Sequence, residues 1–350
     1  MSGDDLRALL RGDGVTHAPG VYDPVTAALA VRAGHRAVHL SGAAISALML
    51  GRPDLDYVPA TQVADRATTL VPALDGVPLL ADADTGYGSP QDAVWTGHAY
   101  ARAGISGLHL DDRAGPGRPG GPPGRPVIDS GRAAAKIKAL ATEVPELAVI
   151  ARTDVYAVKG LGETIVRCGL LAEMGADAVR PEGVHDLDEL AKLHAALPGV
   201  PIVVNRAEAG GNRPVPTDAE LAEVGVRLIL HPITALLAAL RAVALTYRAI
   251  ADTGSATEVD RLPLAVVTEL SGPADASVPH PRRAAGPHRS APDHGAPDLA
   301  GSDLGALGLG ALGLGAPDLT SSGSGRSGYR RPGSGTPRLA APDLAGRLDT

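Results

Sequence analysis

Short apolar runs alternate with longer stretches of helical character from the N-terminus to about residue 250. This alternation is typical of a parallel α/β fold, in which each strand is buried on both faces. We predict eight strands, at His17–Val21, Ala37–Leu40, Pro78–Asp82, Gly107–Asp111, Ala148–Arg152, Ala178–Pro181, Pro201–Asn205 and Arg227–His231. Eight strands with a helix after each one match a (β/α)₈ TIM barrel, which takes about 250 residues. A doubly wound sheet would need a glycine-rich dinucleotide turn after the first strand, and residues 20–24 (GVYDP) do not supply one.

Helix boundaries in the same region are marked by capping residues. Three helix starts are predicted, at Asp23-Pro24, at Ser89-Pro90 and at the capping box Thr217–Glu220. Three helix ends are predicted, at Gly34, Gly104 and Gly175.

The composition changes at about Pro273, where a mixture of Pro, Gly, Ala and Ser begins. The phrase Ala-Pro-Asp-Leu recurs at 296–299, 316–319 and 341–344. Such low-complexity sequence buries too little apolar surface to form a second core. We therefore predict one barrel domain with its C-terminal helices over residues 1–272 and a disordered tail over residues 273–350.

Charge and cysteine content exclude several classes of function. A net charge of −7 without long basic runs argues against nucleic acid as the main partner. The run Leu304–Gly315 is too short and too glycine-rich to span a membrane. Cys168 is the single cysteine, so no disulfide framework exists, and residues 1–5 lack the basic and apolar regions of a signal peptide. We expect a soluble cytoplasmic protein without a membrane or nucleic-acid partner.

The stretch Leu79–Gly88 carries the clearest candidate chemistry. An apolar strand runs into a turn that contains Asp82 and Asp84, and side chains two residues apart share a face of a strand. Two adjacent carboxylates repel unless a cation or a proton lies between them. Oxygen ligands suit Mg²⁺ or Mn²⁺ better than zinc, and Gly86 and Gly88 would let the backbone turn beside such a site. The alternative is a solvated turn, since Asp and Gly are ordinary turn residues.

Polar residues follow six of the predicted strands, at the ends that converge on one face of a barrel. They are Ser41-Gly42, Asp82 with Asp84, Asp111-Asp112, Arg152-Thr153-Asp154, Glu182, and Asn205 with Glu208. Barrel enzymes keep their chemistry on this face, so we predict an active site there.

Several of these residues lie within longer motifs. The motifs occur at 20–23 (GVYD), 39–42 (HLSG), 50–55 (LGRPDL), 82–88 (DADTGYG) and 151–154 (ARTD). In this order they resemble the isocitrate lyase and phosphoenolpyruvate mutase superfamily, over residues from about Gly20 to Gly272. The resemblance implies a Mg²⁺-dependent barrel enzyme that acts on small 2-oxo or 2-hydroxy acids. It also implies a homotetramer in which a C-terminal helix is exchanged between subunits.

The resemblance also implies roles for individual residues. Asp82 and Asp84 would hold Mg²⁺ or Mn²⁺, with Asp111 nearby. Arg152 would face a developing oxyanion, and Asp54 and Asp111 would join it as catalytic residues. The implied substrate contacts are Tyr22, Ser41, Gly42, Ala43, Glu182, Asn205 and Glu208. An enolate oxygen is stabilised by a metal and an arginine placed in advance, so these roles agree with cleavage of a bond next to a carbonyl.

The loop after the fourth strand departs from the lyase pattern. Lyases of the superfamily carry Glu-Asp-Gln and then a loop whose cysteine acts as an acid, whereas this chain reads Asp111-Asp112-Arg113 and has no Cys, Lys or His in Ala114–Arg125. Cys168 lies in the helical stretch Glu163–Met174 and is interpreted as a packed core thiol. The favoured reaction is therefore carbon–carbon cleavage of a small acid rather than of a tricarboxylate.

The sequence is compatible with two other hypotheses about function. Carbon–phosphorus chemistry on phosphonopyruvate or phosphoenolpyruvate is the first, although its usual loop residues are missing and Arg118 and Arg125 alone could contact a phosphoryl group. A catalytically silent member of the superfamily is the second. His109 is interpreted as a core histidine rather than a ligand, and His231 is compatible with either role.

Overall fold

Eight parallel strands form a nearly closed barrel in the computed structural model, which describes residues 3–54, 57–115, 126–206 and 215–270. The strands are β1 (Thr16–Pro19), β2 (Val38–Leu40), β3 (Leu79–Asp82), β4 (Gly107–Asp111), β5 (Ala148–Thr153), β6 (Ala178–Pro181), β7 (Ile202–Asn205) and β8 (Val226–His231). Neighbours pair in the order β1-β8-β7-β6-β5-β4-β3-β2. A bridge between Gly20 and His39 and a hydrogen bond of 2.9 Å from Val21 N to the His39 carbonyl join β1 to β2. The predicted (β/α)₈ barrel is confirmed.

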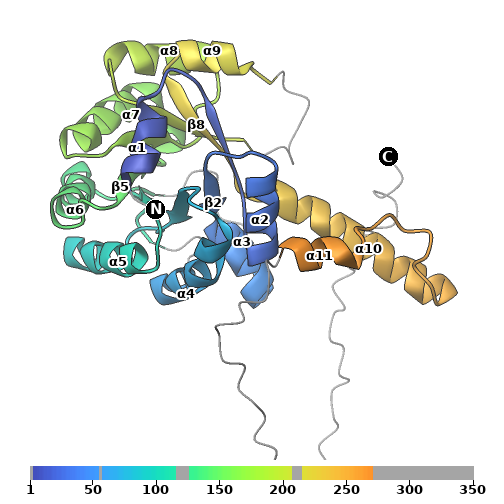
Figure 1. The fold of residues 1–350 in the computed structure, drawn as a ribbon. Coiled ribbons are helices and arrows are strands. Elements are labelled where there is room, and N and C mark those ends of the chain that lie inside the picture. The colour runs from blue at the N-terminus through green and yellow to red at the C-terminus, as the bar shows by residue number, and fades with distance from the viewer. Residues whose placement is uncertain (1–2, 55–56, 116–125, 207–214, 271–350) are drawn as a thin grey trace, which may run out of the picture. The chain divides into compact units, whose positions relative to one another are not determined.

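Helices lie around the strands, and most of them connect one strand to the next (Figure 1). They are α1 (Gly3–Arg11), α2 (Pro24–Arg32), α3 (Gly42–Ile45), the π-helix η1 (Ser46–Leu50), α4 (Ala60–Leu70), the 3₁₀ helix η2 (Val71–Ala73), α5 (Pro90–Arg102), α6 (Ser130–Glu143), α7 (Tyr156–Glu173), α8 (Leu187–Ala196), α9 (Asp218–Glu223), α10 (Thr234–Thr253) and α11 (Leu264–Leu270). The predicted starts are confirmed, because Asp23, Ser89 and Thr217 each form a capping box. The predicted ends are confirmed as well, because Gly34, Gly104 and Gly175 have positive φ.

Apolar side chains fill the barrel toward the end at which the strands begin, and polar residues lie at the carboxyl ends of the strands. The interior cluster consists of Leu6, Leu10, Ala18, Ala37, Leu80, Ala148, Ile150, Ala178, Val203, Leu228 and Leu230. Leu6 comes from α1 and reaches Gly107 at the start of β4, where an added Cβ would lie 2.6 Å from Leu6 Cδ2. Helix α1 therefore closes the end of the barrel at which the strands begin. The carboxyl ends of the strands remain available for chemistry.

Cys168 lies in α7 and is fully buried. It belongs to the apolar cluster that packs between the barrel wall and α7 and α8. Burial raises the pKa of its thiol to about 12. The interpretation of Cys168 as a core thiol is confirmed, and a buried thiol of this kind is chemically inert.

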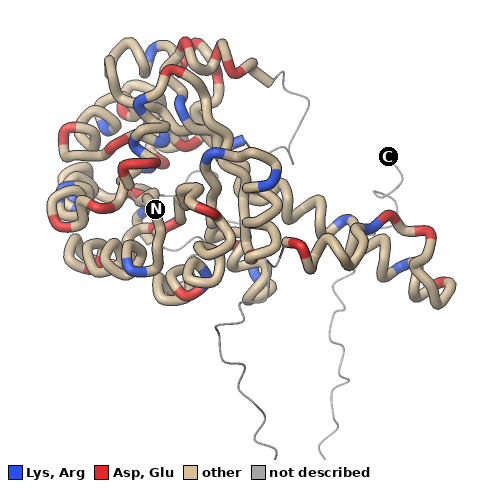
Figure 2. Tube along the Cα trace, in the orientation of Figure 1, with Lys and Arg blue, Asp and Glu red and all other residues tan. Residues whose placement is uncertain are grey.

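Helix α10 extends away from the barrel (Figure 1) and carries few charged residues (Figure 2). It exposes six large apolar side chains, Leu237, Leu240, Val243, Leu245, Tyr247 and Ile250. Among the described residues it is the one helix that is long and apolar enough to cross a membrane by length and composition. Only 6% of its most apolar 18-residue stretch is buried. The absence of a membrane partner and the cytoplasmic location stay predictions.

Several predictions concern residues outside the described ranges. They are the tail at 273–350, most of the loop Ala114–Arg125 with its two arginines, and Glu208. The described residues all belong to one structural unit, Met1–His280. The predicted boundary between residues 272 and 273 stays a prediction.

Candidate active site

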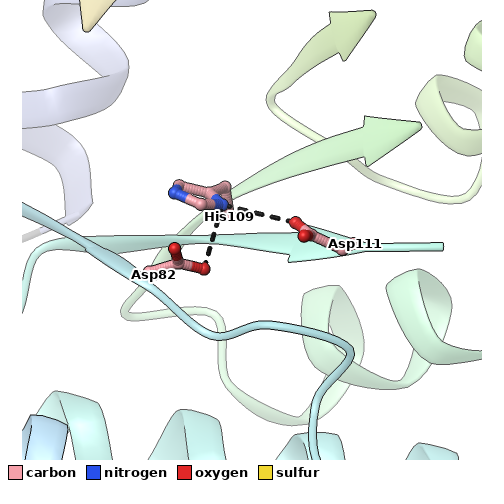
Figure 3. Close-up of side chains that lie close together, drawn as sticks. All are labelled: Asp82, His109 and Asp111. Atoms are coloured by element: carbon pink, nitrogen blue, oxygen red, sulfur yellow. Dashed lines mark ion pairs between the residues drawn. The ribbon is translucent and has the colours of Figure 1, made fainter. Parts of the chain in front are cut away.

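Two carboxylates and an imidazole meet where β3 and β4 end. Asp82 is the last residue of β3, Asp111 is the last residue of β4, and His109 is paired with Asp82 across the two strands. All three side chains are buried, and one ligand atom of each lies within 4.8 Å of the other two. Figure 3 shows His109 Nδ1 directed at both carboxylates, at 3.5 Å from Asp82 Oδ1 and 3.5 Å from Asp111 Oδ1. This metal-competent cluster sits at the predicted end of the barrel.

Asp84 joins the cluster through a turn. Strand β3 ends at Asp82, and Asp84 has a φ of 44°, which is unusual for a residue with a side chain. The turn lets Asp84 N donate to Asp82 Oδ1 at 3.0 Å. Strand alternation is therefore the wrong reason for the proximity of the two aspartates. Gly86 makes the turn possible, because at its φ of 76° an added Cβ would lie 2.9 Å from both Ala93 and Leu110 side-chain carbons.

Arginines neutralise two of the carboxylates, Asp84 and Asp111. Arg113 Nη2 lies 2.7 Å from Asp111 Oδ2 and 3.1 Å from Asp84 Oδ1. Arg152 Nη1 lies 3.2 Å from Asp111 Oδ2. Burial by itself raises the pKa of Asp111, but the charges of Arg152 and Arg113 outweigh it and hold that pKa well below its usual value. Asp111 is therefore an ionised group at every physiological pH.

Arg152 is held rigidly at the end of β5. Its Nε and Nη2 donate to the two oxygens of Asp154 at 2.9 Å each, and Nε lies 3.5 Å from Glu182 Oε2. Burial lowers the pKa of Arg152, yet the charges of Asp111, Glu182 and Asp154 outweigh burial and raise it well above the ordinary value. A bidentate pair of this kind fixes the plane of the guanidinium. The predicted catalytic arginine thus lies beside the metal-competent cluster as a permanent, oriented cation.

A buried network behind the site fixes the backbone that carries Arg152. Asp112 accepts hydrogen bonds from Thr153 Oγ1 at 2.6 Å, from Asp154 N at 3.0 Å and from Arg167 Nη1 at 3.0 Å. The sequence placed Asp112 among the polar strand ends but gave it no role. Its partners show that it braces the end of β5.

Two further buried polar side chains, His39 and Arg180, contact His109. His39 Nε2 lies 3.1 Å from His109 Nε2, and Arg180 Nη1 lies 3.3 Å from the same His109 atom. Arg180 Nη2 donates to Glu182 Oε2 at 2.8 Å. Burial, and then the neighbouring charges of His109 and Arg180, hold the pKa of His39 well below its usual value. His39 stands in the motif at 39–42, but no role was predicted for it or for Arg180. An arginine inside the buried strand Ala178–Pro181 is a signal, since buried charges need partners.

Two groups of predicted substrate contacts lie at the ends of β2 and β7. Ser41, Gly42 and Ala43 lie where β2 enters α3, and Gly42 N points at Asp82 Oδ2 at 3.4 Å. An added Cβ at Gly42 would lie 3.0 Å from the same oxygen, so the position favours glycine. Asn205 ends β7, and its Oδ1 is buried without a hydrogen-bond partner among the described residues. A buried amide oxygen in that state is suited to a ligand at this end of the barrel.

The other described residues of the predicted site have no hydrogen bond given above to Asp82, Asp84 or Asp111. Glu182 follows β6 and pairs with Arg180. Burial by itself raises the pKa of Glu182, but the charges of Arg180 and Arg152 outweigh it and hold that pKa below its usual value. Tyr22 follows β1 and is half-buried, as is Asp54 in the loop after η1. His231 lies 3.0 Å from His17 on the outer wall of the barrel, because the alternate residues Ala18 and Leu230 face inward. His231 therefore lies outside the candidate site.

The donor set fits a hard divalent cation. Asp82, Asp84 and Asp111 provide carboxylate oxygens from adjacent elements. The two oxygens of Asp111 lie in ion pairs, Oδ2 with Arg113 and Arg152 and Oδ1 with His109, but neither accepts a well-aligned hydrogen bond among the described residues. Oxygen donors of this kind suit Mg²⁺ or Mn²⁺. His109 presents to these carboxylates a ring nitrogen that is suited to donating a hydrogen bond, which favours positioning of the carboxylates over metal ligation.

The sequence of the chain matches known enzymes of one family. The family model described as phosphoenolpyruvate phosphomutase matches residues 6–251. The chain is 33% identical to a 2-methylisocitrate lyase of Halalkalibacterium halodurans over 252 residues, which cover 72% of this chain and 83% of that protein. It is 34% identical to a 2,3-dimethylmalate lyase of Eubacterium barkeri over 239 residues, covering 68% and 82%.

Solved structures of enzymes resemble this chain in fold as well. An oxaloacetate acetylhydrolase in complex with the product oxalate superposes with a TM-score of 0.69 at 29% identity, covering 77% of this chain and 93% of that one. A phosphonopyruvate hydrolase in complex with oxalate and Mg²⁺ superposes with a TM-score of 0.67 at 26% identity, covering 77% and 94%.

Proposed function

This chain belongs to the phosphoenolpyruvate mutase and isocitrate lyase superfamily, and we propose that it is a carbon–carbon lyase acting on a small 2-hydroxy or 2-oxo carboxylic acid. The observation that carries the proposal is the buried cluster of Asp82 and Asp111 beside the rigid cation Arg152. The proposed cofactor is Mg²⁺ or Mn²⁺, held by Asp82, Asp84 and Asp111. When bound, such an ion polarises the oxygens of a 2-oxo acid.

The residues of the chain would bind and orient the acid around that site. The backbone amide of Gly42 approaches Asp82, and residues Ser41–Ala43 around it are suited to a substrate carboxylate. Arg152 is suited to the enolate oxygen that develops when the bond next to the carbonyl breaks, because its charge is already in place and does not reorient. Asn205 Oδ1, buried and without a partner among the described residues, is suited to a substrate hydroxyl.

Several observations favour a small substrate. The loop Ala114–Arg125 contains no residue that titrates near neutrality, whereas an acid on that loop contributes about 10²–10⁴-fold in rate where a carbanion must be protonated on one face. The resemblance to tricarboxylate lyases implies an arginine at the position of Leu237, which is an exposed apolar residue of α10 here. Among the relatives, the 2,3-dimethylmalate lyase and the oxalate-bound acetylhydrolase act on or hold small acids. We therefore expect little or no cleavage of isocitrate or methylisocitrate.

A homo-oligomer with exchanged C-terminal helices is also proposed. The apolar side chains exposed on α10 support it, since six large apolar residues on one 20-residue helix form a surface that a monomer rarely leaves in water. Docking against a second copy of the chain would cover them.

The test is a screen of 2-hydroxy and 2-oxo acids with the purified full-length protein in the presence of Mg²⁺. Release of pyruvate or of another small oxo acid is the readout, and Asp82→Asn serves as the inactive control. Turnover of 2,3-dimethylmalate or a similar small acid would support the proposal. Robust methylisocitrate cleavage would contradict the small-substrate part of it.

Carbon–phosphorus chemistry is the second candidate. It is favoured by the family model that matches residues 6–251 and by the likeness to phosphonopyruvate hydrolase. Release of inorganic phosphate from phosphonopyruvate, without turnover of any small acid in the screen, would replace the first proposal with this one. If every substrate of both classes were inert, a catalytically silent role would be favoured.

A further inference from the structure

Arg113 occupies an unusual place, between two of the carboxylates that would hold a divalent cation. A single atom, Nη2, is within 3.1 Å of Asp84 Oδ1 and 2.7 Å of Asp111 Oδ2. The side chain is only 3% exposed, so the pairing takes place away from bulk water. At this point of the site the chain supplies a positive charge of its own.

The backbone around Arg113 is fixed by pairing with the far side of the loop. Arg113 forms an antiparallel bridge with Val127. Ala114 N donates to the Pro126 carbonyl at 2.7 Å, and Ile128 N donates to the Asp112 carbonyl at 2.8 Å. Two paired segments therefore hold the base of the guanidinium side chain. Arg113 is presented to the carboxylates by a rigid element.

The other contacts of the carboxylates set Asp82 apart. Arg152 reaches Asp111 at 3.2 Å, so Asp111 is shared by two arginines. Within the described ranges, the carboxylate of Asp82 contacts two backbone amides and His109, and it contacts no arginine. Asp82 is thus the carboxylate most available to a cation.

From this arrangement we infer that Arg113 is a built-in counter-cation that competes with the divalent ion for Asp84 and Asp111 and sets the affinity of the metal site. The inference rests on the proposed function in taking Mg²⁺ or Mn²⁺ as the ion. An ion anchored on Asp82 must share the carboxylates with Arg113 or displace its Nη2, and two cations at such a short separation repel. Arg113 is a positioning residue in this account, because it acts through the carboxylates.

The test is a titration of the full-length protein with Mn²⁺ alone, followed by calorimetry, for the wild type and for Arg113→Gln. The variant is expected to bind Mn²⁺ about tenfold more tightly or better, since a competing charge has been removed. Arg102→Gln is the matched control, because it removes the same charge from the C-terminal end of α5, at the opposite end of the barrel. It should leave the dissociation constant within about twofold of the wild-type value.

Thermal melting in EDTA and in saturating Mg²⁺ provides a second readout. Without metal, Arg113→Gln should melt lower than the wild type, because Asp84 and Asp111 lose their shared partner. With Mg²⁺, the increase in melting temperature should be larger for the variant than for the wild type. A merely structural role of Arg113 would lower both melting temperatures equally.

A third variant covers the case in which Arg113→Gln fails to fold. Arg113→Lys keeps the charge on a shorter side chain, so its Mn²⁺ affinity should lie between those of the wild type and the glutamine variant. Unchanged or weaker metal binding in the substituted protein that folds would overturn the inference. That result is distinct from failure of the proposed function, which would appear as absent turnover of small acids whatever the metal affinity.

Discussion

Replacement of Arg152 by glutamine should reduce both catalysis and stability, because this arginine contacts three carboxylates at once. It lies 3.2 Å from Asp111, forms two bonds of 2.9 Å with Asp154 and lies 3.5 Å from Glu182. Loss of a prepared group that stabilises an oxyanion reduces kcat by about 10²–10³-fold, which corresponds to roughly 3–4 kcal/mol. Loss of one partner of a buried ion pair costs about 3–5 kcal/mol of stability. For a domain of this size the melting temperature should fall by roughly 6–20 °C.

The two effects are separated by Arg152→Lys. Lysine keeps the charge near Asp111 but cannot form the bidentate pair with Asp154, so it should recover most of the stability and little of the activity. The assay is kcat/KM for the best substrate of the screen, measured below the melting temperature of each variant. If Arg152→Gln kept kcat/KM within about threefold of the wild type while Asp82→Asn abolished turnover, Arg152 would have no role in stabilising the oxyanion.

Three further predictions follow from the described contacts. His39 in the folded chain has a pKa below the usual 6.5, so the unfolded chain takes up a proton first as the pH falls. The stability of the fold should therefore decrease below about pH 6.5. His39→Gln should flatten this dependence in melting curves recorded between about pH 7.5 and 5. Leu240→Glu on the exposed face of α10 should convert the proposed oligomer to monomers in light scattering and leave the circular dichroism spectrum unchanged, whereas an oligomer of unchanged size would exclude α10 from the interface. Truncation after Gly272 should leave the melting temperature within about 1 °C of the full-length value, and a larger drop would show that the tail packs on the barrel.

The sequence by itself determined the barrel, because its signals are local. Strands buried on both faces appear as apolar runs, and β4 and β6 occupy the residues predicted for them. Capping boxes and terminal glycines act within four residues of one another, so helix boundaries can be predicted without tertiary structure. The location of the candidate site was predictable for the same reason. In a parallel barrel every strand end lies on one face, and polar strand ends therefore meet there whatever their exact partners.

Tertiary structure alone decided which of those polar groups pair. Asp82 and Asp84 approach one another because Asp84 adopts a left-handed turn, which the period of a strand does not predict. His109 contacts Arg180 although 71 residues separate them, and Arg152 reaches Asp111 across neighbouring strands. Such contacts depend on strand register and side-chain length in three dimensions, and neither leaves a periodic signal in the chain. His231 shows the same limit, since a single residue at a strand end faces the outer wall or the site according to the register of the closed barrel.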